Sequence, residues 1–353
     1  MIASLRPAAC RSWIAAVCGV AAFAFASRPA PADDVSRTGG QVTVRGEVQD
    51  VTRAGVTVKE VEGTEVEVPA AEIAEISWDG EPANMGTLRS REARGQLVDA
   101  LTGYRDALPR MSGLDAEARA DTQFLIARTL AKLALNDPDR REEAVEALND
   151  FISANPQHYR VDPARRWLAD VQAAAGDSEA AAKTLQELKS SPSPAFQTVA
   201  AISEAKLALQ RGDADEALAT FDSVLQNADG RVAAEAKIGR AAALGRLNRH
   251  SDALTTLDEV LAAVDPDDAQ VRAQVHLRRG DSLLATGDQM PAIIEYLKVD
   301  VLYPGASAAH AESLYHLSRQ WAAVGSPERA AEAAAKLKAN YPNSEWAAKL
   351  SAG

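Results

Sequence analysis

The five histidines are the side chains of this sequence best suited to metal binding or proton transfer. A helix presents two imidazoles to one metal ion when they are four residues apart, as in the H-x-x-x-H and H-E-x-x-H motifs. No pair has that spacing, and the nearest pair is six residues apart, which puts the rings on different helix faces. We therefore expect packing or surface roles and no metal site. The five are His158, His250, His276, His310 and His316.

Two acidic runs resemble fragments of a calcium-binding loop. The run "DPDD" (265–268) lacks the other ligand positions and the terminal glutamate that such a loop needs. The run "GDADE" (212–216) returns in related form along the chain, which indicates a structural role. The sequence also has no G-x-S-x-G, Walker glycine–lysine loop or G-x-G-x-x-G motif. It therefore predicts no cofactor, and an enzyme is disfavoured.

One aromatic and basic island stands out, "QHYRVDPARRW" (157–167). Its tyrosine and arginines could hold the acidic tail of a partner. The alternative, which we favour, is that they solvate a loop between repeats and pack against Trp167. The residues concerned are Tyr159, Arg160, Arg165 and Arg166.

The first 32 residues have the anatomy of a secretory signal peptide. Arg6 and Arg11 precede an apolar run (13–26), and two small-x-small sites follow. The run spans 14 residues, which is short for crossing a bilayer, so an uncleaved anchor is disfavoured. We predict cleavage after Ala32, with Ala26 as the alternative.

Both cysteines, Cys10 and Cys18, lie in this segment. Cys18 follows Val17, where a lipoprotein signal needs a small residue, so a lipid anchor is disfavoured. After cleavage the chain has no thiol for a disulfide or a metal site. No later stretch approaches membrane-span length. The sequence thus predicts a periplasmic or secreted protein with no integral membrane segment.

The charge balance bears on partners. The 353-residue chain has a net charge of −12, which becomes −15 once Arg6, Arg11 and Arg28 are removed. Binding to nucleic acid requires a basic face, so we expect no nucleic-acid partner. The acidic balance instead suits solubility through like-charge repulsion.

Residues 41–80 alternate β-branched and polar residues between glycine turns, as in "AGVTVKEV", which is typical of strands and hairpins. The pattern predicts a small, strongly bent sheet or barrel that is similar to an SH3-like or Sm-like module. We favour a cap that docks on the following helices over an independent ligand-binding domain. The preceding residues 33–40 are expected to be a disordered lead.

The period changes from two to helical after "DGEPANM" (79–85). Residues 81–113 are predicted to be a linker helix. Residues 114–353 are predicted to be an α-solenoid of about six helical hairpins, so the fold class is mainly α with a small all-β module in front.

A phrase of the form glycine, acidic or polar residues, then an apolar-spaced run recurs through the second half of the chain. Five residues after each turn residue stands an alanine, nine residues after it is mostly a large apolar residue, and seven before it is a small one. The small residues allow two helices to approach closely, the turn residue takes the left-handed conformation that ends the first helix, and the large residues fill the space between hairpins. The turn residues are Gly176, Gly212, Asn248, Gly287 and Gly325.

This pattern resembles the tetratricopeptide repeat (TPR), with one further divergent copy ending at "EEAVEALNDFISANP". The resemblance covers about residues 114–350, and its periods of 36 to 39 residues exceed the 34-residue TPR unit. It implies stacked hairpins whose first helices line a concave groove at family positions 2, 5, 9 and 12. Carried onto positions 5 and 9 here, the resemblance implies a partner-binding groove that includes Arg166, Asp170, Lys206, Asp281, Tyr315 and Arg319.

The resemblance implies a non-enzymatic, exported scaffold that binds protein or peptide partners in the bacterial cell envelope. The closing "YPNSEWAAKL" (341–350) is similar to repeats of bacterial envelope TPR proteins, which are outer-membrane assembly factors and cell-division coordinators. A structural or assembly role at the outer membrane or cell wall is therefore the alternative. The β module would then be a docking domain.

Overall fold

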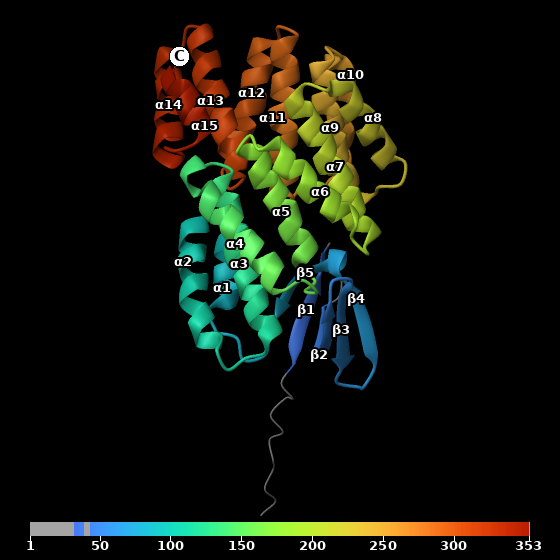
Figure 1. Cartoon of the computed structure of the whole chain (residues 1–353). Helices are drawn as coiled ribbons and strands as arrows, with labels where there is room; N and C mark the ends of the chain where they lie inside the picture. The colour runs from blue at the N-terminus through green and yellow to red at the C-terminus, as the bar shows by residue number, and fades with distance from the viewer. Residues whose placement is uncertain (1–31, 39–42, 353) are drawn as a thin grey trace, which may run out of the picture. The chain divides into compact units, whose positions relative to one another are not determined.

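The computed structural model describes residues 32–38 and 43–352, a small antiparallel sheet followed by helices to the end of the chain (Figure 1). The predicted signal peptide and both cysteines lie outside the described residues. Among the residues that are described, no helix is long and apolar enough to cross a membrane.

The sheet has five strands in the order β4-β3-β2-β1-β5, all antiparallel. Alternation puts valine and isoleucine side chains into its core, and Val35, Val58 and Ile76 are fully buried. The resemblance to SH3-like or Sm-like modules stays a prediction. The strands are β1 (Asp33–Arg37), β2 (Val44–Thr52), β3 (Gly55–Glu60), β4 (Glu65–Pro69) and β5 (Ile73–Ser77), with a 3₁₀ turn (Ala70–Glu72) before the last.

The expectation of a disordered lead over 33–40 is wrong for Asp33–Arg37, which forms strand β1 between β2 and β5. The stretch "DDVSR" is short and polar, so it carries no strand pattern of its own. Tertiary contacts provide the order: Val35 is buried, and the Asp33 carboxylate accepts backbone N–H groups of Val48 (3.0 Å) and Asp79 (2.8 Å).

The predicted linker helix over 81–113 is in fact a pair, α1 (Met85–Ala93) and α2 (Leu97–Ala107), that pack on each other. Gly95 separates them with φ +79°, a left-handed conformation that glycine adopts without strain. A short 3₁₀ turn, Leu108–Met111, leads from this hairpin to the next helix.

Six further helical hairpins follow, and each pairs a first helix with the second helix that comes after it. A single helix closes the chain. The hairpins are α3 (Ala116–Ala134) with α4 (Arg141–Ala154), α5 (Val161–Ala174) with α6 (Ser178–Lys189), α7 (Pro194–Arg211) with α8 (Ala214–Leu225), α9 (Gly230–Arg246) with α10 (His250–Ala263), α11 (Ala269–Ala285) with α12 (Gln289–Leu302) and α13 (Ser307–Ala323) with α14 (Pro327–Asn340); a 3₁₀ turn, Pro138–Arg140, precedes α4, and α15 is Glu345–Ala352.

The turn residues behave as the repeat pattern predicts. All five have positive φ, and Asn248, at φ 59°, is the one non-glycine residue of the described chain that does. The four alanines that follow the first four turns are fully buried, while Ala330 after the last is partly buried. The repeat is therefore a structural joint, and the prediction that "GDADE" has a structural role is confirmed.

Two glycines allow a helix to pack closely on a large buried ring: Gly280, the small residue before the turn at Gly287, and Gly239 on α9, which meets a ring of the preceding hairpin. A Cβ added at Gly280 would lie 2.5 Å from a ring carbon of Tyr296, and one at Gly239 would lie 2.3 Å from the ring of Phe221. Both rings are fully buried. The close approach of α11 to α12 within one hairpin, and of α9 to α8 between two hairpins, thus depends on a missing side chain.

The sheet shares its hydrophobic core with the helices. Buried strand residues form one cluster with Met111, Tyr159, Leu185 and Phe196, which come from four different parts of the helical region. The sheet is therefore packed onto the first hairpins through an apolar interface.

The last hairpin and the residues just before it also contact the turns of the first two hairpins. The Asn136 amide donates to the Ser307 hydroxyl (3.3 Å), and the Asn343 amide donates to the Asp137 carboxylate (3.3 Å). Next to them, a Cβ added at Gly95 would lie 3.1 Å from the carbonyl oxygen of Gly305. These contacts join segments about 200 residues apart in the sequence.

Gly280→Ala should lower the free energy of unfolding by about 1–3 kcal/mol, because the new methyl group overlaps the buried Tyr296 ring. Gly245→Ala is the matched control, since its Cβ in α9 would meet nothing within 4 Å. It should be neutral or stabilising by up to about 1 kcal/mol. Urea unfolding followed by circular dichroism measures both, and equal effects of the two substitutions would contradict the close-packing account.

Candidate functional site

The first helices of successive hairpins line two adjoining cavities of about 630 and 440 Å³. The two share the lining residues Leu209, Gln210, Ala242 and Arg278, so they form one continuous groove along α5, α7, α9, α11 and α13. Each of these helices contacts the next in the series. We call this surface the groove.

Its charged lining is nearly balanced, in contrast to the acidic chain as a whole. Five basic and four acidic residues lie along it, and most are half-buried. They are Arg166, Lys206, Arg231, Arg246 and Arg278, and Asp170, Glu235, Asp281 and Glu312.

In the larger cavity one carboxylate holds two basic side chains from neighbouring helices. The same oxygen of Glu235 on α9 accepts from Arg166 on α5 (2.8 Å) and from Lys206 on α7 (2.5 Å). Burial by itself raises the pKa of Glu235, but the two cations outweigh it and bring the pKa to about 2. Glu235 is therefore ionised at neutral pH and links three hairpins.

Asp170 lies beside this trio with weaker contacts. Its carboxylate is 4.0 Å from Arg166, one turn away on α5. Burial raises its pKa above the ordinary value, and the attraction of Arg166 and Lys206 only partly opposes this. Asp170 is thus the least satisfied acid of the groove and the one best placed to gain from a partner's hydrogen-bond donor.

In the smaller cavity the roles are reversed, because one cation holds two acids. Arg278 donates to Asp281 (2.6 Å) and to Glu312 on α13 (2.8 Å). The Tyr296 hydroxyl also donates to Asp281 (2.9 Å), which fixes the carboxylate from the second helix of the same hairpin.

An aromatic group stands at the end of this cavity. His316 stacks on Tyr296 with ring centres 4.8 Å apart and lies within 6.0 Å of Trp346 on α15. Burial lowers the pKa of His316 below the ordinary value, despite the acids Asp281 and Glu312 nearby. The ring is therefore neutral at neutral pH, and this end of the groove offers flat aromatic surface beside charge.

Of the six predicted site residues, four line the two cavities of the groove and two do not. Arg166, Asp170 and Lys206 line the larger cavity and Asp281 the smaller one. Tyr315 lines neither, but its ring packs on Trp346 (5.3 Å), which does. Arg319 is exposed and lines neither cavity.

Sequence reasoning missed Glu235, Gln274 and Glu312. Each stands 13 residues before its turn residue, which is family position 2, so extending the same register by one turn would have found them. Arg278 has no such signal, because it lies one residue after position 5.

The hypothesis that the island at 157–167 holds a partner's acidic tail is wrong for Tyr159 and Arg160. Both are buried, and both donate to Asp121 of this same chain, at 2.6 and 2.9 Å. The favoured alternative also needs correction, because these two side chains form a buried contact and do not solvate a loop. Arg165 pairs with Asp162 and Glu187, and Arg166 alone of the four reaches the groove.

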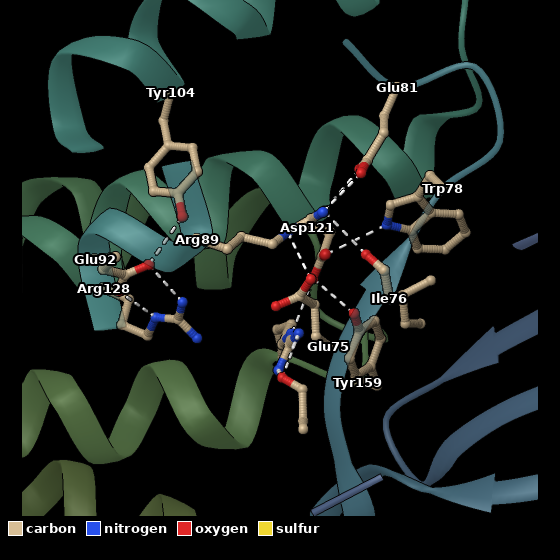
Figure 2. Close-up of polar contacts among 12 residues, drawn as sticks. Glu75, Ile76, Trp78, Glu81, Arg89, Glu92, Tyr104, Asp121, Arg128 and Tyr159 are labelled. Carbon is tan, nitrogen blue, oxygen red and sulfur yellow. Dashed lines mark hydrogen bonds and ion pairs between the residues drawn. The ribbon is translucent and has the colours of Figure 1, made fainter. Parts of the chain in front are cut away.

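Asp121 on α3 is the centre of a buried polar junction between sheet and helices (Figure 2). Besides Tyr159 and Arg160, it accepts the indole N–H of Trp78, which follows β5 (3.3 Å). Arg160 in turn lies 3.4 Å from the carbonyl oxygen of Ala74 in β5. Burial by itself raises the pKa of Asp121, but Arg160 and its other partners hold the pKa at about 2.

Two more buried charges continue this junction (Figure 2). Arg89 on α1 donates to Glu81 (2.6 and 2.7 Å) and to the carbonyl oxygen of Ile76 (3.0 Å). Glu92, one turn later, accepts from Arg128 (2.8 and 2.6 Å) and further donors on α2 and α3. The edge strand β5 is thereby covered by arginine side chains, which use its free carbonyl groups.

Within residues 32–38 and 43–352, no group of three or more histidine, cysteine or acidic residues is placed to hold a metal ion. Two histidines form pairs in the interior, His276 with Glu295 (2.6 Å) and His310 with Asp300 (3.0 Å).

Comparisons with known proteins agree with the fold. No protein-family model matches the sequence, and no curated protein matches it. A Rap protein in complex with competence and sporulation factor has a similar structure, with a TM-score of 0.51 and 12% identity over 75% of this chain and 77% of that one.

Two other solved structures are TPR-related or pilus-related by their descriptions. A tetratricopeptide repeat protein from Parabacteroides merdae has a TM-score of 0.47 and 16% identity, and the alignment covers 72% of this chain and 91% of that one. PilW, a type IV pilus biogenesis factor, has a TM-score of 0.43 and 16% identity, and covers 65% of this chain and 97% of its own.

Hairpins in register, left-handed turn residues and contacts between successive first helices define the class. The fold is a TPR-type α-solenoid, preceded by a small five-stranded antiparallel sheet. The resemblance found in the sequence is thereby confirmed at the level of the fold.

Asp121→Asn should lower the free energy of unfolding by about 3–5 kcal/mol at neutral pH, because it leaves the Arg160 charge buried without a counter-ion. The folded pKa of about 2 lies below the ordinary value near 3.9, so the stabilisation by Asp121 is present above about pH 4. It is lost as the pH falls from about 4 to 2, and the two proteins should converge there.

Urea unfolding at several pH values measures this difference. Asp150→Asn is the control, since Asp150 is exposed on α4 and its loss should change stability by no more than about 0.5 kcal/mol. A difference between Asp121→Asn and the parent protein that is as small as that of the control would contradict the role of the junction.

Proposed function

We propose that this chain is an exported, non-enzymatic scaffold of the bacterial cell envelope that binds a segment of a partner protein in the groove. The observation that carries the proposal is the pair of half-buried ionic clusters on five successive first helices, the surface on which solenoids bind partners. The Rap structure with TM-score 0.51 was solved with a bound factor, which supports a binding role for this fold.

The dimensions suit an extended segment. Neighbouring helices pack about 10 Å apart, so five first helices span about 40 Å. An extended chain rises about 3.3 Å per residue, so about 12 residues cover that distance. Such a segment meets charge at both ends of the groove, the Glu235 cluster at one and the Arg278 cluster at the other.

The existing ion pairs define how a partner would bind. Arg166 and Lys206 already share one carboxylate, so either of them can donate to an acidic side chain of the partner while the other still compensates Glu235. Asp170 accepts donors from the partner, and Trp346 and His316 supply apolar surface. The groove thus selects a segment that carries both signs of charge and an apolar or aromatic residue.

The sheet is better explained as a fixed part of the solenoid than as a separate docking domain of an assembly factor. A mobile docking domain would be joined by a linker, whereas this sheet shares an apolar core and the Asp121 junction with the helices. We therefore place the partner-binding surface in the groove, and we assign the sheet the task of covering the first hairpins.

Lys206→Glu should abolish partner capture, because it places a third acid beside Glu235 and Asp170 in the larger cavity. The test immobilises the parent protein and its variants, exposes them to solubilised envelope fractions, identifies the retained protein by mass spectrometry and measures its binding directly. Arg319→Glu makes the same charge change outside both cavities and should leave binding intact. Equal binding by all three proteins would contradict the groove as the binding surface.

Export is tested separately, by N-terminal sequencing of the protein recovered from fractionated cells. We expect a chain that starts at Asp33, which leaves the first residue of β1 and its hydrogen bonds to Val48 and Asp79 intact. A start at Ser27 would show cleavage after Ala26. Recovery of the uncleaved chain in the cytoplasm would contradict export and leave the groove prediction untouched.

A further inference from the structure

The last hairpin lies against the first two hairpins (Figure 1), but this contact differs from those between successive hairpins. Five clusters of buried apolar side chains join the hairpins in chain order, from α1 to α5, α5 to α7, α7 to α9, α9 to α11 and α11 to α15. Among the described residues, no cluster has members from both α1–α4 and α13–α15. The two ends of the solenoid therefore meet without a shared apolar core.

Polar side chains hold the two ends together. The Asn136 amide donates to the Ser307 hydroxyl and the Asn343 amide donates to Asp137, both at 3.3 Å, which is slightly longer than the usual N–H···O range. None of the four residues is buried, so water competes for each of these groups and the net gain from each bond is small. We call these four residues the latch.

The contact between the ends also leaves space unfilled. A cavity of about 270 Å³ lies there, lined by Leu97, Val98 and Leu133 from the first hairpins and by Tyr341 and Pro342 after the last. Its apolar wall is partly open to water, since Val98 is 59% exposed. The interior of a folded protein is close-packed, with few voids of this size. The two ends thus touch without the packing of a permanent interface.

The latch lies next to the groove. Leu135, immediately before Asn136, directly follows α3 and lines the larger cavity together with Gln274 of α11. Ser307 is the first residue of α13, whose later turns line the smaller cavity. Helices α3 and α11 are four hairpins apart in the chain, yet they bound one cavity. Separation of Asn136 from Ser307 would therefore draw α3 away from α11 and α13 and widen the groove.

The larger cavity is narrow for the segment that we propose as its occupant. Its volume of about 630 Å³ is that of a pocket for a small molecule, which is about 300–1,000 Å³. A segment of about 12 residues is longer and bulkier than such a molecule. It needs a wider groove to enter, and the parting of the two ends is the motion that supplies one.

We propose that the latch opens and closes the solenoid, so that the groove widens to admit a partner segment and then narrows around it. The inference rests on the proposed function in one respect, because it assigns a regulation to the same groove. A bound segment contacts the α3 side and the α11 side at once only in the closed form, so it shifts the population toward that form. Without a partner, both forms are populated, because only the weak contacts of the latch favour closure.

Distances between spin labels test the exchange in the full chain. Labels on Asp99→Cys of α2 and Lys338→Cys of α14, both exposed, lie on opposite sides of the latch, in a background where Cys10 and Cys18 are replaced by serine. Pulsed electron paramagnetic resonance then gives the distribution of distances. We expect a short and a long distance, which represent the closed and the open form.

Asn343→Asp should raise the ratio of the open to the closed form about fivefold, because it sets a second carboxylate against Asp137. The effect should vanish in about 1 M salt, which screens exposed charges. Asn227→Asp makes the same change on an exposed residue after α8 and should leave the distribution unchanged. A single short distance that Asn343→Asp does not alter overturns the proposal, since the two ends are then fixed.

A thiol in the groove tests whether the latch controls access to it. Ala242 lines both cavities, so Ala242→Cys in the same serine background places one thiol there. A maleimide on a long polyethylene glycol chain should react about fivefold faster when Asn343→Asp is added than when Asn227→Asp is added. The small reagent N-ethylmaleimide should react at similar rates with both. Equal rates with the large reagent overturn the control of the groove by the latch.

Neither experiment uses a partner protein. A groove that captures no partner would contradict the proposed function and leave the two distances and the labelling rates as expected here. A fixed pair of ends would contradict the latch and leave partner capture, and its loss in Lys206→Glu, unaffected. The two proposals therefore fail separately.

Discussion

The structure depends on one buried carboxylate. Asp121, at 1% exposure, is reached by the indole of Trp78 and by the phenol and guanidinium of the adjacent Tyr159 and Arg160, which come from two separate parts of the chain. A buried charge is tolerable only when its partners are present, so the carboxylate fixes the end of β5, helix α3 and the entry to α5 in a single arrangement. The sheet is held by this requirement as well as by its apolar core. The orientation of α5, and with it the first charged residues of the groove, follows from the same contact.

In the groove, too, each central charge is held by partners of opposite sign, but these ion pairs are less buried than the Asp121 junction. Glu235 pairs with cations from two neighbouring helices, and Arg278 pairs with Asp281 of its own helix and with Glu312 of the next, so the spacing of the first helices is set by electrostatics as well as by packing. Because these pairs are half-exposed, water competes with them and they can exchange partners. The junction around Asp121 cannot, since its members are sealed from solvent. One fold thereby contains a rigid polar cluster and an adaptable one.

The sequence predicted what is periodic and missed what is unique. Turn residues and the alanines that follow them recur every 36 to 39 residues, so a repeat register reveals them, and the same register gives the groove positions that we propose on the first helices. Strand β1 and the Asp121 junction occur once and depend on residues far apart in the chain. In the sequence, Asp121 cannot be told apart from a solvated helical acid, because its partner Arg160 lies 39 residues away. The stretch "DDVSR" has no strand pattern of its own and becomes a strand by pairing with β2 and β5. Arg319 differs from the other five, because the register assigns it to the groove while it is exposed and lines neither cavity.

An open array of repeats can gain or lose a unit during evolution, since each unit touches only its neighbours. The hydrogen bonds from Asn136 to Ser307 and from Asn343 to Asp137 remove that freedom here. An added or deleted hairpin would move the two ends of the solenoid past each other by a full repeat and separate Gly95 from Gly305. A change in the number of repeats would therefore break the contacts between the two ends of the solenoid, as it would break closure in a β-propeller.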